Sequence, residues 1–88
     1  MINQRLLDII RILLKQNTYV TIAELANEID VSYKTVANDL KKVDVWLTEH
    51  GLDLIKKTGV GVTIEGNNKT KLSVYQFIVE KSKENIDY

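Results

Sequence analysis

The sequence predicts a mostly α-helical domain that carries one small β-hairpin. Apolar residues recur at helical spacing in four stretches, near residues 3–16, 22–29, 33–50 and 69–85. Between residues 52 and 65 they alternate with polar residues instead, which is typical of two short strands. Because the chain has 88 residues, it forms one domain at most, and roughly 60 to 65% of the unfolded surface can be buried at that size.

The first expected helix begins after Asn3, which can cap it, and runs to about Gln16. Its apolar residues cover more than one face, so we expect it to be central and the most buried. They are Leu6, Leu7, Ile9, Ile10, Ile12, Leu13 and Leu14. Asn17 and Thr18 end the helix, and the β-favouring Tyr19 and Val20 could pair with the later hairpin as a third strand. The basic residues of this first helix are expected to be solvated charges rather than phosphate contacts. They are Arg5, Arg11 and Lys15.

Two helix start signals follow, eleven residues apart. Thr21 and Glu24 have the spacing of a capping box, and Ser32 can cap a further helix. Only Asp30 and Val31 lie between these two helices, so the connection is too short for anything but a fixed angle. An Asp tolerates the left-handed backbone that such a turn needs, and Val31 can pack between the helices. This pattern predicts a helix-turn-helix.

The second of these helices has a polar outer face. Its inward stripe consists of Val36, Leu40, Val43 and Leu47. At 100° per residue, the opposite face consists of Lys34, Asn38, Lys41 and Val45. Lysine and asparagine hydrogen-bond to base edges and phosphates in the major groove of DNA, so this face predicts DNA contact.

Gly51 is the expected end of that helix, and His50 before it is predicted to cap the helix rather than to serve catalysis or a metal. The hairpin strands are expected at residues 52–56 and 61–65, joined by Lys57, Thr58 and Gly59. A last helix, capped by Asn67 or Asn68, has an apolar surface that needs a cover. It packs on the rest of the domain, forms a dimer seam or leads into a further domain, and the polar residues 81–88 are expected to fray.

This pattern resembles the winged helix-turn-helix domain that opens bacterial sugar-operon regulators with phosphotransferase-regulation domains. It is also similar to the DeoR-type and biotin-repressor-type winged helices. The resemblance covers residues 6–66, and its matching points are Val31, Ser32, Thr35, Val36, Asp39, Leu40, Gly59, Gly61 and Gly66. The sequence departs from the pattern at Asp30, where Gly is common, and at Val62, which replaces the usual aromatic residue of the wing. The resemblance implies a mostly α fold with a small β wing.

The function predicted first is sequence-specific binding of double-stranded DNA by residues 1–66, with residues 67–88 as a C-terminal helix, linker or dimerisation element. Asn38 suits adenine, and Lys34 or Lys41 suits guanine. Tyr33 and Thr35 suit phosphate or thymine methyl groups. Phosphate contacts are expected from Thr21, Ser32 and Lys42. The wing residues Lys56, Lys57 and Thr58 are expected to contact DNA as well, with the two lysines on phosphate or in the minor groove. A homodimer would place two such helices about 34 to 36 Å apart on DNA.

The composition of the chain narrows the range of possible functions. The chain lacks Cys, has 12 basic and 12 acidic residues, and shows no nucleophile–base pair or metal-ligand spacing, so neither an enzyme nor a cofactor is predicted. The zero net charge predicts weak nonspecific DNA affinity. The zero net charge is also compatible with an alternative function, a protein-interaction module whose contact surface consists of Val45, Trp46 and the last helix. Without a long apolar run or signal pattern, we expect no membrane contact and a cytoplasmic location. By resemblance, phosphotransferase-system proteins would act through domains that this chain lacks.

Overall fold

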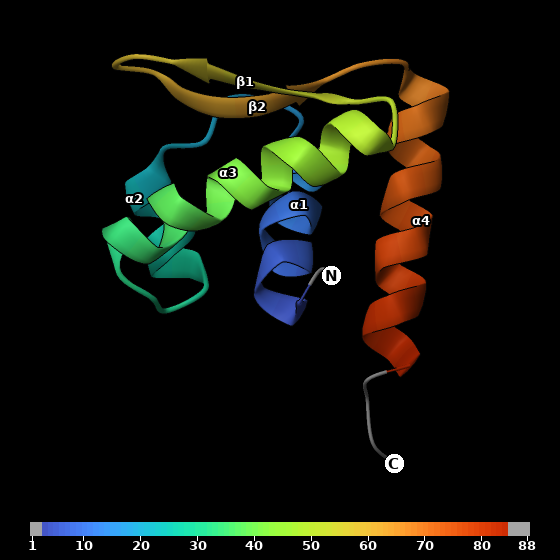
Figure 1. Ribbon diagram of the computed structural model, residues 1–88, viewed down its shortest axis with the longest axis horizontal. Coiled ribbons are helices and arrows are strands. Elements are labelled where there is room, and N and C mark those ends of the chain that lie inside the picture. Colours follow the sequence, from blue (N-terminus) through green and yellow to red (C-terminus); the bar gives the residue numbers. More distant parts are fainter. Residues whose placement is uncertain (1–2, 85–88) are drawn as a thin grey trace.

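The computed structural model describes residues 3–84, with side chains as far as Lys81. The elements are α1 (Gln4–Gln16), α2 (Ile22–Glu28), α3 (Tyr33–Glu49), β1 (Asp53–Lys57), β2 (Gly61–Glu65) and α4 (Asn68–Glu84). The hairpin lies across α3, with its turn near α2, and α4 stands at the opposite end of α3 (Figure 1). This arrangement confirms the winged helix-turn-helix fold that the sequence predicts.

Helix α1 lies at the centre of the core, as expected. Six of its apolar side chains are buried, and the helix contacts α3, α4 and β2. Asn3 caps its start, with the side-chain oxygen accepting a hydrogen bond of 3.0 Å from the Leu6 backbone N–H. At its end Asn17 adopts a left-handed backbone with φ 52°, and its N–H donates to the Leu13 carbonyl. A short polar side chain therefore does here what glycine commonly does.

The sheet has two strands, and the segment that could add a third strand pairs with the hairpin through one residue only. Val20 makes a single antiparallel bridge to Val62, in which each residue donates its N–H to the carbonyl of the other at 2.8 Å. The first strand of the hairpin is also shifted by one residue from the prediction, whereas β2 has the predicted bounds. Lys57 belongs to β1 because it pairs with Gly61, and the turn is closed by a bond from the Val60 N–H to the Lys57 carbonyl.

Helix α4 packs back on the domain. Its Val74 and Ile78 are buried in the common core, and it contacts α1. Lys71 donates a hydrogen bond of 3.2 Å to the Asn17 side chain, and the Asn67 side chain caps the helix through the Lys69 N–H. The helix continues through Glu84, so residues 81–84 of the segment expected to fray are helical here, and residues 85–88 lie outside the described part. The division of the chain after residue 66 stays a prediction.

Candidate nucleic-acid interface

The capping box at the start of α2 forms as predicted. The Thr21 hydroxyl oxygen accepts from the Glu24 N–H at 3.0 Å, and the Glu24 carboxylate accepts from the Thr21 N–H at 3.4 Å and from its hydroxyl at 3.0 Å. The hydroxyl proton of Thr21 is thus already donated. Thr21, predicted to bind phosphate, has no free hydroxyl proton for a phosphate while the box is intact.

The turn between α2 and α3 is a Schellman motif with an aspartate at its left-handed position. Asp30 has φ 57°, and its N–H donates to the Asn27 carbonyl at 3.4 Å. The Val31 N–H donates to the Ala26 carbonyl at 3.0 Å. These are the two bonds that define this helix ending. Val31 packs against the core, as predicted, so the turn holds α3 at a fixed angle to α2.

Ser32 and Thr35 form the start of α3. The Ser32 hydroxyl oxygen accepts from the Thr35 N–H at 3.1 Å, which confirms the predicted cap, and the two hydroxyl groups lie 2.9 Å apart. Since one hydroxyl must donate to the other, one hydroxyl proton of the pair is left for an outside acceptor. Ser32 is exposed and Thr35 half-buried, so the pair lies at the surface beside the outer face of α3.

Helix α3 divides into a buried and an exposed face, as predicted. Its inward stripe is fully buried and consists of Val36, Leu40, Val43 and Leu47. The predicted outer face is exposed and consists of Lys34, Asn38, Lys41 and Val45. Tyr33, at the first position of the helix, is 60% exposed. A helix held by its apolar face therefore presents two lysines and an amide to the outside.

A groove joins the wing to the helix-turn-helix. Five residues predicted from the sequence to contact DNA line it together: Thr21, Tyr33, Lys56, Lys57 and Thr58. Apolar residues, including Ile22 and Val60, complete its wall. The structure thus brings the cations of the hairpin end beside the start of α3. This proximity comes from the fold, since the rest of α3 and β1 lie between Tyr33 and the end of the hairpin in the sequence.

Gly61 allows the wing to approach the chain before α2. It has φ 136°, and a Cβ atom at this position would lie 2.5 Å from the Val20 carbonyl oxygen. Such a contact is shorter than real Cβ contacts, and the neighbouring atom is backbone that cannot swing away. The Val20–Val62 bridge and the Cβ-free residue beside it therefore fix the wing to the segment that caps α2.

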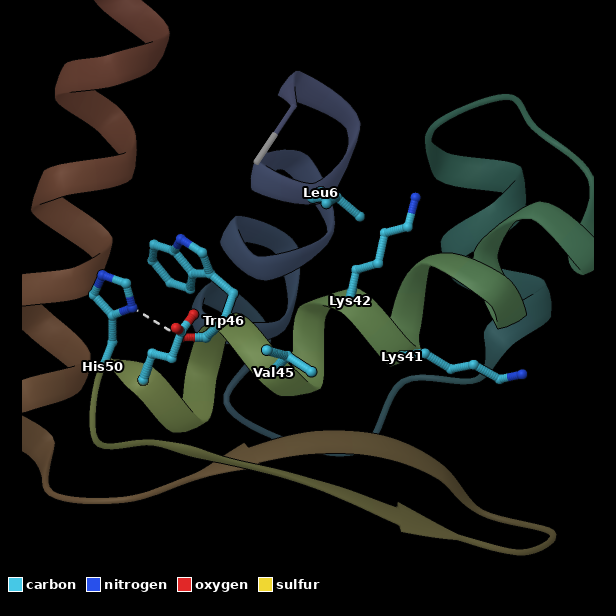
Figure 2. A pocket seen from close by; sticks show the side chains of 7 residues that line it. Leu6, Lys41, Lys42, Val45, Trp46 and His50 are labelled. Atoms are coloured by element: carbon cyan, nitrogen blue, oxygen red, sulfur yellow. Dashed lines mark hydrogen bonds between the residues drawn. The ribbon is translucent and has the colours of Figure 1, made fainter. Parts of the chain in front are cut away.

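Lys41 and Lys42 lie apart from this groove, over a shallow hollow lined also by Leu6, Val45, Trp46, Glu49 and His50. Figure 2 shows the two lysine side chains diverging, with Lys42 pointing past Leu6 of α1. His50 caps α3, because its ring lies 2.8 Å from the Trp46 carbonyl oxygen through Nδ1. A carbonyl can only accept, so Nδ1 carries the proton. The ring also stacks on Trp46 with centroids 3.8 Å apart, which supports the predicted capping role.

An ion pair between Arg5 of α1 and Asp39 of α3 was not predicted from the sequence. Arg5 donates to both carboxylate oxygens, from Nε to Oδ2 and from Nη2 to Oδ1, the latter at 3.1 Å. The hydrogen bond to Asp39, followed by the charge of the carboxylate, raises the pKa of Arg5 above its ordinary value. The sequence signal was present, because Asp39 lies 60° from Val36 on the helix, next to the buried stripe.

Neither a metal site nor a membrane span is found in the described part of the chain. Residues 3–84 contain no group of three or more His, Cys, Asp or Glu side chains that could hold a metal ion. The same residues contain no helix with the length and apolar character that a membrane span requires.

Two caps, a tight turn, a helix with a polar outer face and a hairpin beside it define a winged helix-turn-helix domain. A family model described as an HTH domain matches residues 5–69, and the chain belongs to this family. It is also similar to the transcriptional regulator ManR of Bacillus subtilis (strain 168), with 38% identity over 76 residues. The match covers 82% of this chain and 12% of ManR, so the chain spans a small part of that relative. No solved structure matches the chain with significance.

The family match and ManR confirm the resemblance to bacterial regulators that the sequence pattern indicates. The family match extends over the whole helix-turn-helix and the wing, since it runs from residue 5 in α1 to residue 69, beyond β2. Neither comparison bears on which individual side chains contact a ligand.

Proposed function

We propose that this chain is the sequence-specific DNA-binding domain of a bacterial transcriptional regulator. The observation that carries the proposal is the outer face of α3, where Lys34, Asn38 and Lys41 are exposed opposite a fully buried apolar stripe. A major groove about 12 Å wide admits one α-helix, so this face can reach base edges while the stripe keeps the helix on the domain. The helix-turn-helix family to which the chain belongs supports the same function.

In this proposal some side chains of the interface contact bases and give specificity, and others contact the DNA backbone and give affinity. In this proposal Asn38 pairs with adenine and Lys34 or Lys41 with guanine, each contact worth about 1 to 3 kcal/mol of discrimination. Lys56, Lys57 and Thr58 contact the DNA backbone beside α3, because they share a groove with Tyr33. Lys42 and the hydroxyl pair of Ser32 and Thr35 contact phosphate on the other side of the helix.

Charge balance favours specificity over nonspecific affinity. Residues 21–30 carry three acidic side chains and no basic one, so α2 adds no cationic surface, and the whole chain has zero net charge. Nonspecific binding depends on neutralised phosphates and should therefore be weak. Pairing of two domains on a palindromic site would compensate, and we propose a homodimer on DNA.

The biological setting is inferred from ManR, a transcriptional regulator by name. We propose that the domain acts in the bacterial cytoplasm, on genes of carbohydrate uptake or metabolism. Phosphotransferase-system proteins would then control it through regulatory domains that lie beyond the chain described. A protein-interaction module is less supported, because the outer face of α3 carries lysine and amide groups whereas interface cores are enriched in aromatic residues.

The test is selection of binding sites from a pool of random duplex DNA at fixed salt. Wild-type protein should enrich one motif, and Asn38→Ala should lose or relax it. Gln76→Ala, which removes an exposed amide from α4, is the matched control and should enrich the wild-type motif. A lack of enrichment by wild-type protein at micromolar concentration, as monomer and as an artificially linked dimer, would refute the proposal.

A further inference from the structure

Asp39 is an acidic side chain of α3 that is buried in the domain and paired with Arg5 of α1. Its side chain is 5% exposed, and the side chain of its partner Arg5 is 40% exposed. Both carboxylate oxygens accept from Arg5, one from Nε and one from Nη2. An arginine fork on a carboxylate constrains direction as well as distance, unlike the point charge of a lysine. The contact joins the first turn of α1 to the middle of α3.

Stability alone does not account for this ion pair. Only Asp39 is buried, and desolvation of its carboxylate offsets the Coulomb attraction, so such a pair can commonly be replaced by apolar side chains without loss of stability. Helix α3 is already anchored by Val36, Leu40 and Val43, all fully buried. Apolar contacts are non-directional, however, so they permit small rotations of a helix about its axis. The two hydrogen bonds between Arg5 and Asp39 are directional and therefore oppose such a rotation of α3.

The position of Asp39 makes such a rotation matter. It directly follows Asn38 in α3, so the direction of the Asp39 side chain sets the direction of Asn38. With side chains a helix has a radius of about 5 to 6 Å, so a rotation of roughly 20° moves a side-chain tip by about 2 Å. A hydrogen bond to a base edge tolerates only a few tenths of an ångström.

We propose that Arg5 and Asp39 are positioning residues that fix the rotation of α3 and thereby decide which of its side chains face the bases. The inference rests on the proposed function and deepens it. Phosphate contacts from flexible lysines tolerate a rotated helix, whereas base contacts do not. The ion pair therefore controls the ratio of specific to nonspecific affinity rather than affinity as a whole.

The test compares two double variants that both leave the net charge unchanged. Arg5→Met with Asp39→Leu replaces the buried pair by apolar side chains. Arg11→Met with Asp8→Leu is the matched control, because this arginine–aspartate pair lies within α1 and does not reach α3, its aspartate is 30% exposed, and its nearest atoms are 3.7 Å apart. Affinities for the selected site and for a scrambled duplex are measured at one salt concentration, with urea unfolding of each protein.

In the Arg5→Met, Asp39→Leu protein, the ratio of specific to nonspecific affinity should fall about tenfold, which is the size of one lost base contact. Its nonspecific affinity and unfolding midpoint should stay near wild type, and the control variant should keep the wild-type ratio. A folded Arg5→Met, Asp39→Leu protein with an unchanged ratio overturns the inference. If that variant does not fold, Arg5→Lys decides, since it keeps the charge but loses the fork, and an unchanged ratio again overturns the inference. Wild-type protein without sequence preference would refute the proposed function itself, before any variant is compared.

Discussion

The helix-turn-helix and the wing are held in place by contacts of different range. The ends of helices α2 and α3 and the turn between them are fixed by neighbours in the sequence: the Thr21–Glu24 box, the turn at Asp30 and the cap at Ser32. The wing is fixed by the bridge from Val62 to Val20, which precedes both helices. The two systems meet where Val20 adjoins Thr21. The position of the wing is therefore expected to respond to distant substitutions, and the helix ends and turn of the helix-turn-helix to local ones.

The largest expected effect comes from breaking the wing at Gly61. Gly61→Ala places a Cβ against the Val20 carbonyl and a side chain on a backbone of φ 136°, so it should lower the free energy of unfolding by about 3 kcal/mol or more. Urea unfolding measures the loss. Gly59→Ala in the same hairpin is the control, because a Cβ there meets nothing within 4 Å and only the strain of φ 78° remains, about 1 kcal/mol. Equal losses in the two variants would contradict the close approach.

A smaller effect is expected from breaking the helix-turn-helix at its cap. Thr21→Ala removes the oxygen that accepts from the Glu24 N–H, and should lower the free energy of unfolding by about 1 kcal/mol. Ser73→Ala, at an exposed position within α4, should change it by less than about 0.5 kcal/mol. A Thr21→Ala protein as stable as wild type would show that the capping box contributes little.

The two regions should also differ in how they bind DNA. Lys57→Ala should weaken binding to all duplexes alike and reduce the slope of log affinity against log salt by about 0.9, as expected for one lost phosphate contact. Lys34→Ala should instead change the preferred sequence, because its side chain lies on the outer face of α3. Titration of both proteins at several salt concentrations separates these effects. A change of base preference in Lys57→Ala would assign specificity to the wing as well.

The smallest expected effect is a gain in stability at the turn between α2 and α3. Asp30→Gly should raise the free energy of unfolding by about 0.5 kcal/mol, because glycine occupies the left-handed region at φ 57° without a Cβ penalty. Asn17→Gly, at φ 52°, should gain less, since it also removes the acceptor of the Lys71 hydrogen bond. Thermal unfolding of both proteins would show the order, and a loss of stability in Asp30→Gly would mean that the aspartate side chain itself stabilises the turn.

Most of the fold was predictable because its signals are local. Asn3, Thr21 and Ser32 each cap the helix that the sequence assigned to them, and Asp30 takes the left-handed backbone expected of it. Helix caps and turns depend on residues within one or two helical turns, so a single sequence contains the needed information.

The contacts that the sequence did not predict join distant residues. Arg5 was expected to be a solvated charge, and its partner Asp39 lies 34 positions further along the chain. The pairing of Val20 with the hairpin was expected, but it is a single bridge to Val62 rather than a strand. Of the site, the exposed face of α3 followed from helical periodicity. The groove between Tyr33 and the wing lysines required the structure, since no spacing in the sequence encodes it.

The central claim is that the outer face of α3 contacts bases, and one measurement tests it directly. Affinities of wild-type, Asn38→Ala and Gln76→Ala proteins are compared on the selected site and on its single base-pair variants, at fixed salt. Asn38→Ala should lose about 1 to 3 kcal/mol of discrimination at one A·T position and none elsewhere, while Gln76→Ala matches wild type. An Asn38→Ala protein that discriminates at every position as wild type does would contradict the account.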